Sequence, residues 1–266
     1  MNLLAYAQNS QLTETVNIPG SEHSATSVRA LPDTLQVLRR WYHCFMILHQ
    51  NGLCLLGRFG SPNVLIYTNR VVRLTGVHLS HFTRAGGDLD YMQFVVSAEE
   101  FFTLRESVPD DIRAWLELIR EGVNGYEYLI RYSACLMEPA QAFSWLMESR
   151  SVLDDLRIND PFTLNRVIWM YPELFDWDLD SYCVNTLMRS AREHVDIRTR
   201  RPIEFEPDVR GVLKLGRHCS QHPAKFKEKY MVLIIEDDFR GFVAHFQLIL
   251  FEVGLLQRFN LELTMG

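Results

Sequence analysis

One stretch of this chain combines residue types suited to acid–base chemistry on a phosphate: residues 209–222, V-R-G-V-L-K-L-G-R-H-C-S-Q-H. Arginine remains charged and can hold a phosphate through two parallel hydrogen bonds, and a histidine with a pKa of ~6.5 can give or take a proton near neutral pH. These are the groups that cleavage of RNA without a metal needs, because its transition state requires proton transfer and positive charge near the phosphate oxygens. Arg217, His218 and His222 are therefore candidate catalytic residues.

Positive charge is concentrated in the same region. Residues 189–229 hold eleven Lys and Arg against six Asp and Glu, although the whole chain carries a net charge of −6. Such a segment is typical of a phosphate-binding surface, but it is also what an ordinary solvated face contains. Two weaker alternatives are a metal site at the His218 and His222 pair, which lacks a third ligand, and a reactive thiol at Cys219.

Composition predicts an intracellular protein, soluble in the cytoplasm or nucleus, with no cofactor. Hydrophobic residues make up 47% of the 266 residues, enough to supply a core. The five cysteines are scattered and form no C-x-x-C pair, which argues against a disulfide framework and against a zinc site. No uncharged apolar run approaches the length of a membrane span, and the first residues do not resemble a targeting peptide. We therefore expect no membrane attachment.

The periodicity of the apolar residues predicts a mainly α-helical fold with a small β-hairpin. The region 1–33 shows no sustained periodicity and is predicted to be a flexible arm. Helical spacing starts at residue 34 and stops before Asn51, and the runs 64–67 and 71–74 have the composition of two paired strands. Further helices are predicted at 112–120, after Glu138-Pro139, and over 237–259.

The helix and hairpin resemble the centre of a protein kinase C-lobe. The resemblance lies in L-H-Q-N-G, at the end of the helix, and in the segments that follow it up to residue 80. Where that family has H-R-D, this chain has Leu56-Gly57-Arg58, and where the family has D-F-G it has Gly76-Val77-His78, while the loop asparagine is kept as Asn63. The resemblance implies a kinase-like lobe that cannot transfer a phosphoryl group, because both carboxylates are missing.

The C-terminal part resembles the KEN ribonuclease domain of the unfolded-protein-sensor kinase/endoribonucleases and ribonuclease L. The matching residues are Val209, Arg210, Val212, Leu213, Lys214, Arg217 and His222. The resemblance implies that Arg217 stabilises phosphate charge and that His222 is the general acid. It places His218 where the family has an asparagine and Glu204 where the family has a tyrosine.

These expectations divide the chain into an arm (1–33), a degenerate kinase-like C-lobe (34–157) and a KEN-like domain (158–266). The predicted function is metal-independent cleavage of RNA by Arg217 and His222, with Glu204 or His218 in supporting roles. The competing prediction is a non-catalytic scaffold that binds RNA or pairs with an active relative, and Glu204 favours it because a carboxylate repels phosphate. In the resembling family the nuclease acts as a dimer, so RNA and a second related chain are the expected partners.

Overall fold

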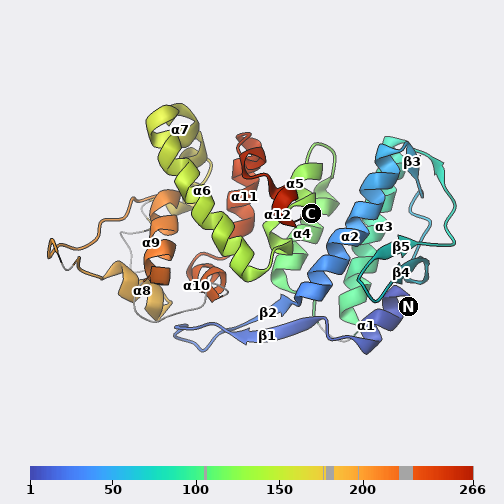
Figure 1. Cartoon of the computed structure of the whole chain (residues 1–266), viewed down its shortest axis with the longest axis horizontal. Coiled ribbons are helices and arrows are strands. Elements are labelled where there is room, and N and C mark those ends of the chain that lie inside the picture. The colour runs from blue at the N-terminus through green and yellow to red at the C-terminus, as the bar shows by residue number, and fades with distance from the viewer. Residues whose placement is uncertain (105–106, 176, 178–182, 197, 222–229, 266) are drawn as a thin grey trace. The chain divides into compact units, whose positions relative to one another are not determined.

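The computed structural model describes residues 1–104, 107–175, 177, 183–196, 198–221 and 230–265. The fold is mainly helical, with 61% helix and 10% strand, and its small sheets are antiparallel and two-stranded. The chain forms two compact units, which consist of residues 1–15 with 28–136 and of residues 16–27 with 137–266 (Figure 1). The predicted mainly helical fold with a small hairpin is confirmed.

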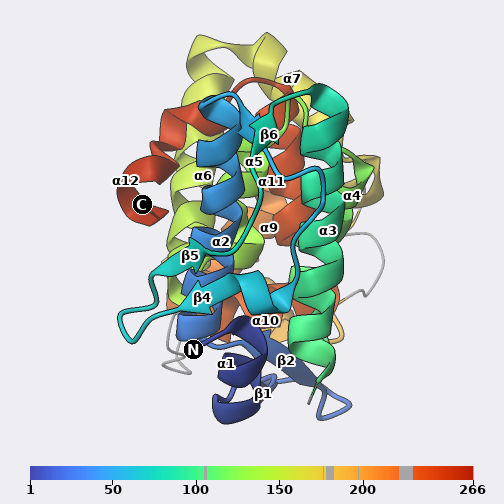
Figure 2. The same cartoon turned by 90° about the vertical axis from the view of Figure 1, so that its right-hand side faces the viewer.

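The first unit contains two long helices that lie side by side, with short strands and smaller helices around them (Figure 2). Strands β3 and β6 pair with each other, and β4 pairs with β5 to form the predicted hairpin. The hairpin of β1 and β2 divides its residues between the two units. The elements are α1 (Leu3–Asn9), β1 (Thr13–Asn17), β2 (Thr26–Ala30), α2 (Pro32–Gln50), β3 (Leu53–Cys54), η1 (Ser61–Asn63), β4 (Val64–Ile66), β5 (Val72–Leu74), β6 (Ser80–His81), α3 (Arg84–Thr103), α4 (Asp110–Glu121), α5 (Glu127–Arg131) and η2 (Ala134–Leu136).

An aromatic cluster forms the core of the first unit. The apolar stripe of α2 is buried, as its helical spacing predicts. The ring of Trp41 on α2 meets Phe94 of α3 edge to face at 4.7 Å between centroids, and Phe94 meets Trp115 of α4 at 5.6 Å. The indole of Trp115 also donates a 2.9 Å hydrogen bond to the carbonyl of Ile130, so the one polar atom of this buried ring is satisfied.

The second unit is built on α6, which contacts α7, α9 and α10. The ring centre of Trp145 on α6 lies 6.0 Å from the ring centres of both Phe246 and Phe259. These contacts join α6 to the C-terminal elements. Asp160 ends α6 and caps α7. The elements are α6 (Pro139–Asn159), α7 (Pro161–Trp169), η3 (Pro172–Leu174), α8 (Thr186–Arg192), α9 (Val209–Gln221), α10 (Met231–Asp238), α11 (Phe242–Glu252), η5 (Leu256–Phe259) and α12 (Leu261–Met265).

The N-terminal region is ordered, so the prediction of a flexible arm over 1–33 is corrected. Leu3 and Ala7 on α1 are fully buried, and Asn2 caps this helix by accepting a hydrogen bond from the Ala5 amide at 2.8 Å. The backbone of Met1 exchanges two hydrogen bonds with Ile66 at the end of β4. The region is held by partners about 65 residues away along the chain, which local periodicity does not reveal.

Two other boundaries differ from the sequence-based expectation. The division between the units falls after residue 136, whereas residue 158, predicted to start the second domain, lies in the last turn of α6. The helix predicted over 237–259 is broken at Gly241 and again at Gly254, which have φ values of +74° and +78°. Left-handed backbone at these glycines ends one helix and lets the next begin, and Glu236 accepts the free amides of Gly241 and Val243 at the start of α11.

Candidate nucleic-acid interface

Helix α9 carries the predicted cations on its outer face. Its buried positions are mostly apolar, whereas Arg210, Lys214, Arg217 and His218 are exposed or half-buried. Arg210, Arg217 and His218 each lie three or four residues from Lys214, which is the spacing of neighbours on one helical face. At the start of the helix the backbone of Glu206 lies very close to Gly211. A Cβ atom on Gly211 would lie 1.9 Å from the carbonyl oxygen of Glu206. Only glycine fits there.

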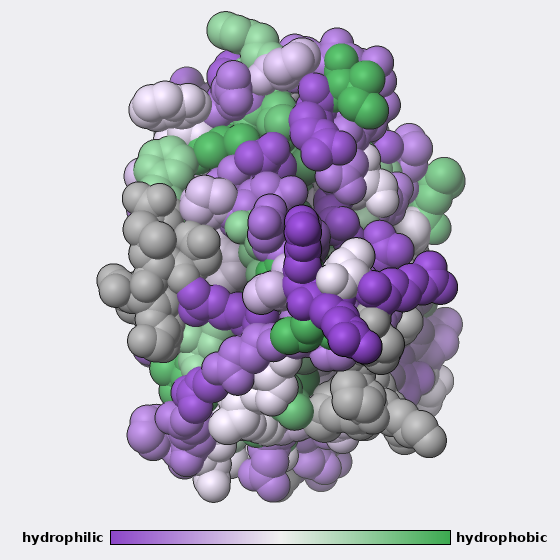
Figure 3. All heavy atoms as spheres, turned by 90° about the vertical axis from the view of Figure 1, so that its left-hand side faces the viewer, coloured by the Kyte–Doolittle hydropathy of each residue, from purple (hydrophilic) through white to green (hydrophobic). Residues whose placement is uncertain are grey.

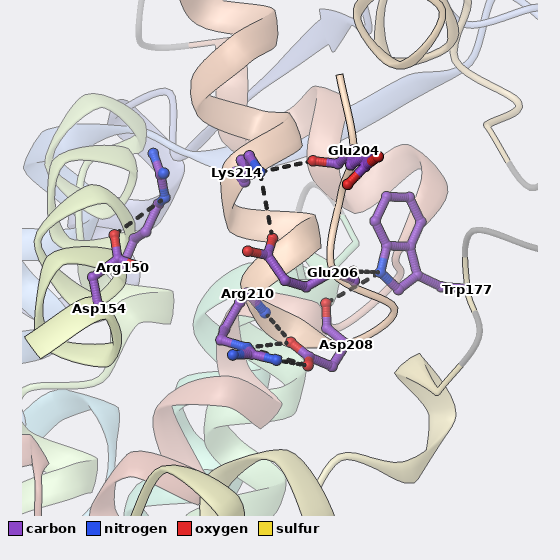
Figure 4. A network of polar contacts seen from close by, with 8 residues as sticks. All are labelled: Arg150, Asp154, Trp177, Glu204, Glu206, Asp208, Arg210 and Lys214. Atoms are coloured by element: carbon purple, nitrogen blue, oxygen red, sulfur yellow. Dashed lines mark hydrogen bonds and ion pairs between the residues drawn. The ribbon is translucent and has the colours of Figure 1, made fainter. Parts of the chain in front are cut away.

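Arg210 is committed to an internal ion pair. Its Nη2 and Nε atoms donate to both carboxylate oxygens of Asp208 at 2.6 Å to 3.2 Å, and its backbone amide donates to the same carboxylate at 2.8 Å (Figure 4). The hydrogen bond to Asp208 raises the pKa of Arg210 further above its ordinary value. Trp177 donates to the carbonyls of Glu206 and Asp208, which fixes the segment that holds the pair. Arg210 therefore positions this segment and is not available to a phosphate.

Lys214 is partly neutralised in the same way. Its ammonium group donates to the backbone carbonyl of Glu204 at 2.7 Å and lies 3.7 Å from the Glu206 carboxylate (Figure 4). It also lies 5.7 Å from the centre of the Phe205 ring. Glu204, predicted as a possible base, offers its carbonyl to Lys214, and its carboxylate is exposed and makes no hydrogen bond or ion pair among the described residues. The contact of Glu204 with α9 is thus made by its backbone.

His218 lies in a small aromatic cluster. Its ring centre is 5.2 Å from that of His194 and 6.3 Å from that of Phe205. His194 follows α8 and comes from a part of the chain to which sequence reasoning assigned no role. Only the local excess of basic residues could have drawn attention to it. The structure therefore brings two imidazoles together. Arg217, the residue before His218 on α9, is exposed and forms no ion pair within the part of the chain that the structure describes.

An arginine-rich turn starts next to this cluster. Val195 pairs with Pro202 in an antiparallel bridge, and the His194 carbonyl accepts the Ile203 amide at the base. Asp196 closes the turn, since its carboxylate accepts the amides of Arg198 and Thr199 at 2.8 Å each. These hydrogen bonds hold the pKa of Asp196 below its usual range, and the bond from the Thr199 amide has the larger effect. The turn exposes its three arginines, Arg198, Arg200 and Arg201.

We call Arg198, Arg200, Arg201 and Arg217 the basic surface. Arg189 forms an ion pair with Glu22 instead. Figure 3 views the second unit from this side, and most of the side chains that it exposes are hydrophilic. Guanidinium groups without an acidic partner can bind phosphate oxygens in pairs of hydrogen bonds. The arrangement can therefore bind a polyanion.

Three other predicted features have different outcomes. His222, predicted as the general acid, lies outside the described residues. Cys219 is buried, and burial raises the pKa of its thiol to about 11, so it is not an activated nucleophile. No group of three or more His, Cys, Asp or Glu that could hold a metal ion is found among the described residues.

The loop that resembles a kinase catalytic loop is held from beneath by Asp90. This fully buried carboxylate on α3 accepts the amides of Leu55 at 2.8 Å and Gly57 at 2.7 Å, and it lies 3.0 Å from Nε2 of His49. The side-chain oxygen of Asn63 accepts a hydrogen bond from the Gly60 amide, and its side-chain nitrogen donates to the carbonyl of Thr75. Both polar atoms of this side chain therefore form hydrogen bonds with the backbone. At the loop surface, the side chain of Arg58 is exposed.

No family model, curated protein or solved structure matches this chain significantly. In the portion of the chain that the structure describes, none of the helices has the length and apolar character needed to cross a membrane.

Proposed function

We propose that the second unit binds RNA through the basic surface, as a KEN-type module joined to a kinase-like C-lobe that no longer transfers phosphate. The observation that carries the proposal is the separation of the cations of this unit into two groups. Arg210 and Lys214 have acidic partners that come from the segment before α9. Arg200, Arg201 and Arg217 are exposed and form no ion pair among the residues that the structure describes, and Arg198 has only the nearby charge of Asp196. Exposed guanidinium groups suit the phosphodiester backbone, which supplies most of the affinity of such complexes.

The first unit supports the kinase-like part of the proposal through the order of its elements. Helix α2, the loop that follows it and the β4–β5 hairpin occur in the sequence order that the resemblance implies. The two positions that carry carboxylates in an active kinase hold Arg58 and Gly76. An arginine cannot accept the proton of an attacking hydroxyl, and a glycine has no side chain that could hold Mg²⁺. The lobe would then act as a scaffold for the second unit.

Cleavage of the bound RNA is the second candidate function, and the pair of imidazoles favours it. Transfer of a phosphate to the neighbouring 2′-hydroxyl needs one group that accepts a proton and one that donates it. His218 and His194 lie in contact, and Arg217 on the adjacent position could stabilise charge on the phosphate. Glu204 contributes less, since it is the backbone of this residue that contacts α9. We therefore place binding before cleavage.

A binding and cleavage assay with a labelled RNA hairpin in EDTA tests both candidates. Binding of the wild-type protein should weaken steeply as salt rises, and Arg217→Ala should lower the salt slope by about one charge. Arg84→Ala, which removes an exposed helical arginine from the first unit, is the matched control and should bind as wild type does.

The outcomes separate the two candidates. Cleavage that disappears in both His218→Ala and Arg217→Ala would establish the enzyme. Binding without cleavage at any protein concentration would establish the scaffold. An affinity that does not respond to salt, or an absence of binding, would refute the proposal. Sedimentation of the protein with and without RNA would show whether a second copy takes part.

A further inference from the structure

The exposed face of α7 carries two large aromatic side chains. Phe162, Asn165, Arg166 and Trp169 are all exposed, and their spacing of three, four and seven residues places them on one face of the helix. The side chain of Phe162 is 75% exposed and that of Trp169 is 73% exposed. Two large aromatic rings left in solvent on a nine-residue helix need a reason, because burying either would release ~1.5–3 kcal/mol.

The orientation of the Trp169 ring is constrained. It meets Phe175 edge on, with 6.0 Å between the ring centres and 83° between the ring planes. An edge-to-face contact holds an aromatic ring and covers at most one of its two faces. Trp169 therefore presents a ring face to solvent at little further cost in conformational entropy, as residues that stack on a ligand need to do.

The charged residue on the face that carries the two rings is Arg166, which is exposed. The nearest acidic residue along the chain is Asp160, at the start of α7. The carboxylate of Asp160 is occupied as the cap of α7, where it accepts hydrogen bonds from the amide and hydroxyl of Thr163 at 3.1 Å and 2.6 Å. The positive charge of Arg258 also lies close enough to lower the pKa of this carboxyl, after the larger effect of Thr163. Arg166 is thus the charge that a ligand on this face of α7 meets.

From these observations we infer that the exposed face of α7 stacks the unpaired bases of single-stranded RNA, with Arg166 between the two rings at the phosphate backbone. This inference rests on the proposed function, since it names the form of RNA that the second unit prefers. Seven residues of helix separate Phe162 from Trp169 by ~10 Å, which is roughly three stacked nucleotide steps. Bases in a duplex are covered by their neighbours, whereas a single strand can turn its bases onto aromatic rings.

Binding of fluorescent oligoadenylate and of a blunt RNA duplex of equal length tests the inference by anisotropy. Trp169→Ala and Phe162→Ala should each weaken oligoadenylate binding roughly 5- to 150-fold, which corresponds to ~1–3 kcal/mol per stacked base. The duplex should lose less than twofold, and Trp169→Phe should restore most of the single-strand affinity. The matched control is Ile158→Ala, because Ile158 is also 75% exposed but has no ring on which a base can stack.

The outcomes distinguish the inference from the proposed function. If the wild type binds oligoadenylate and both ring variants bind it equally well, the inference is wrong and RNA binding through the basic surface stands. If the wild type binds neither RNA, both fail. A protein that self-associates in sedimentation through Trp169, with unchanged RNA affinity in Trp169→Ala, would identify the face of α7 as a protein contact and would also overturn the inference.

Discussion

Asp90 provides the sharpest test of how the first unit is held together. Its carboxylate is fully buried and accepts the amides of Leu55 and Gly57 while it pairs with His49. Between these two amides lies Leu56, which has a φ of +56°, a conformation that non-glycine residues adopt only at a cost. The hydrogen bonds from Asp90 therefore hold a strained turn. Its replacement by alanine should release the loop that follows β3.

The expected magnitude follows from these contacts. A hydrogen bond to a charged group contributes ~1.5–3 kcal/mol, and removal of one member of a buried charged network typically costs ~3–5 kcal/mol. We therefore expect Asp90→Ala to lower the free energy of unfolding of the first unit by about 3–5 kcal/mol. Asp90→Asn should cost about half as much, because its amide oxygen can still accept one of the two backbone hydrogen bonds.

Chemical denaturation combined with hydrogen exchange measures this effect. Asp88→Ala, on the exposed side of the same helix, is the matched control and should change stability by less than ~0.5 kcal/mol. In Asp90→Ala the amides of Leu55 and Gly57 should exchange much faster than those in the middle of α2. The reasoning would be refuted if Asp90→Ala stayed within ~1 kcal/mol of wild type, or if these two amides kept their protection.

Three other predictions concern the second unit. Gly211→Ala should destabilise the second unit by at least ~2 kcal/mol, since the new Cβ atom would lie 1.9 Å from a backbone carbonyl oxygen. In the control Gly216→Ala, the new Cβ atom would meet only the end of a flexible side chain at 2.9 Å, so this change should cost less stability. Thermal unfolding of the two variants compares these costs directly. Burial raises the pKa of Asp238 to about 6, so its ionised form destabilises the fold and stability is lost as pH rises from about 4 to 6. The stability of Asp238→Asn relative to the wild type should therefore increase as the pH rises over that range. An equal pH dependence of the free energy of unfolding in the two proteins would contradict this. The thiols of Cys183 and Cys219, whose pKa values burial raises to about 11, should react with iodoacetamide at pH 8 only after denaturant is added, and rapid labelling of the native protein would show that they are accessible thiolates.

Local pattern was sufficient to locate most of the helices and the hairpin. The apolar spacing of α2 and α4, and the paired β-branched runs of β4 and β5, place these elements close to where the structure has them. Such elements follow from the period of the side chains along the backbone, which is visible in any short window of sequence. The same pattern did not break the last helix at Gly241, because a glycine inside a helical pattern costs only ~1 kcal/mol and does not by itself decide the boundary.

The N-terminal region shows where local pattern is insufficient. Helix α1 has seven residues, too few to be stable alone in water, and it is ordered by burial of Leu3 and by hydrogen bonds between Met1 and Ile66. Those partners are distant in sequence. A short segment of this kind looks like a mobile arm until the surface that covers it is known.

The sequence by itself determined which residues of α9 can carry positive charge, because the side-chain types and the helical period are properties of the chain alone. Only the tertiary structure decided which of those charges remain free. Asp208 and Glu206 reach Arg210 and Lys214 because their segment passes close to the helix at Gly211. Arg217 lies further along the helix, where it is exposed and forms no ion pair among the described residues. Ion pairing depends on distances of a few ångströms between segments, and those distances are set by how the chain packs.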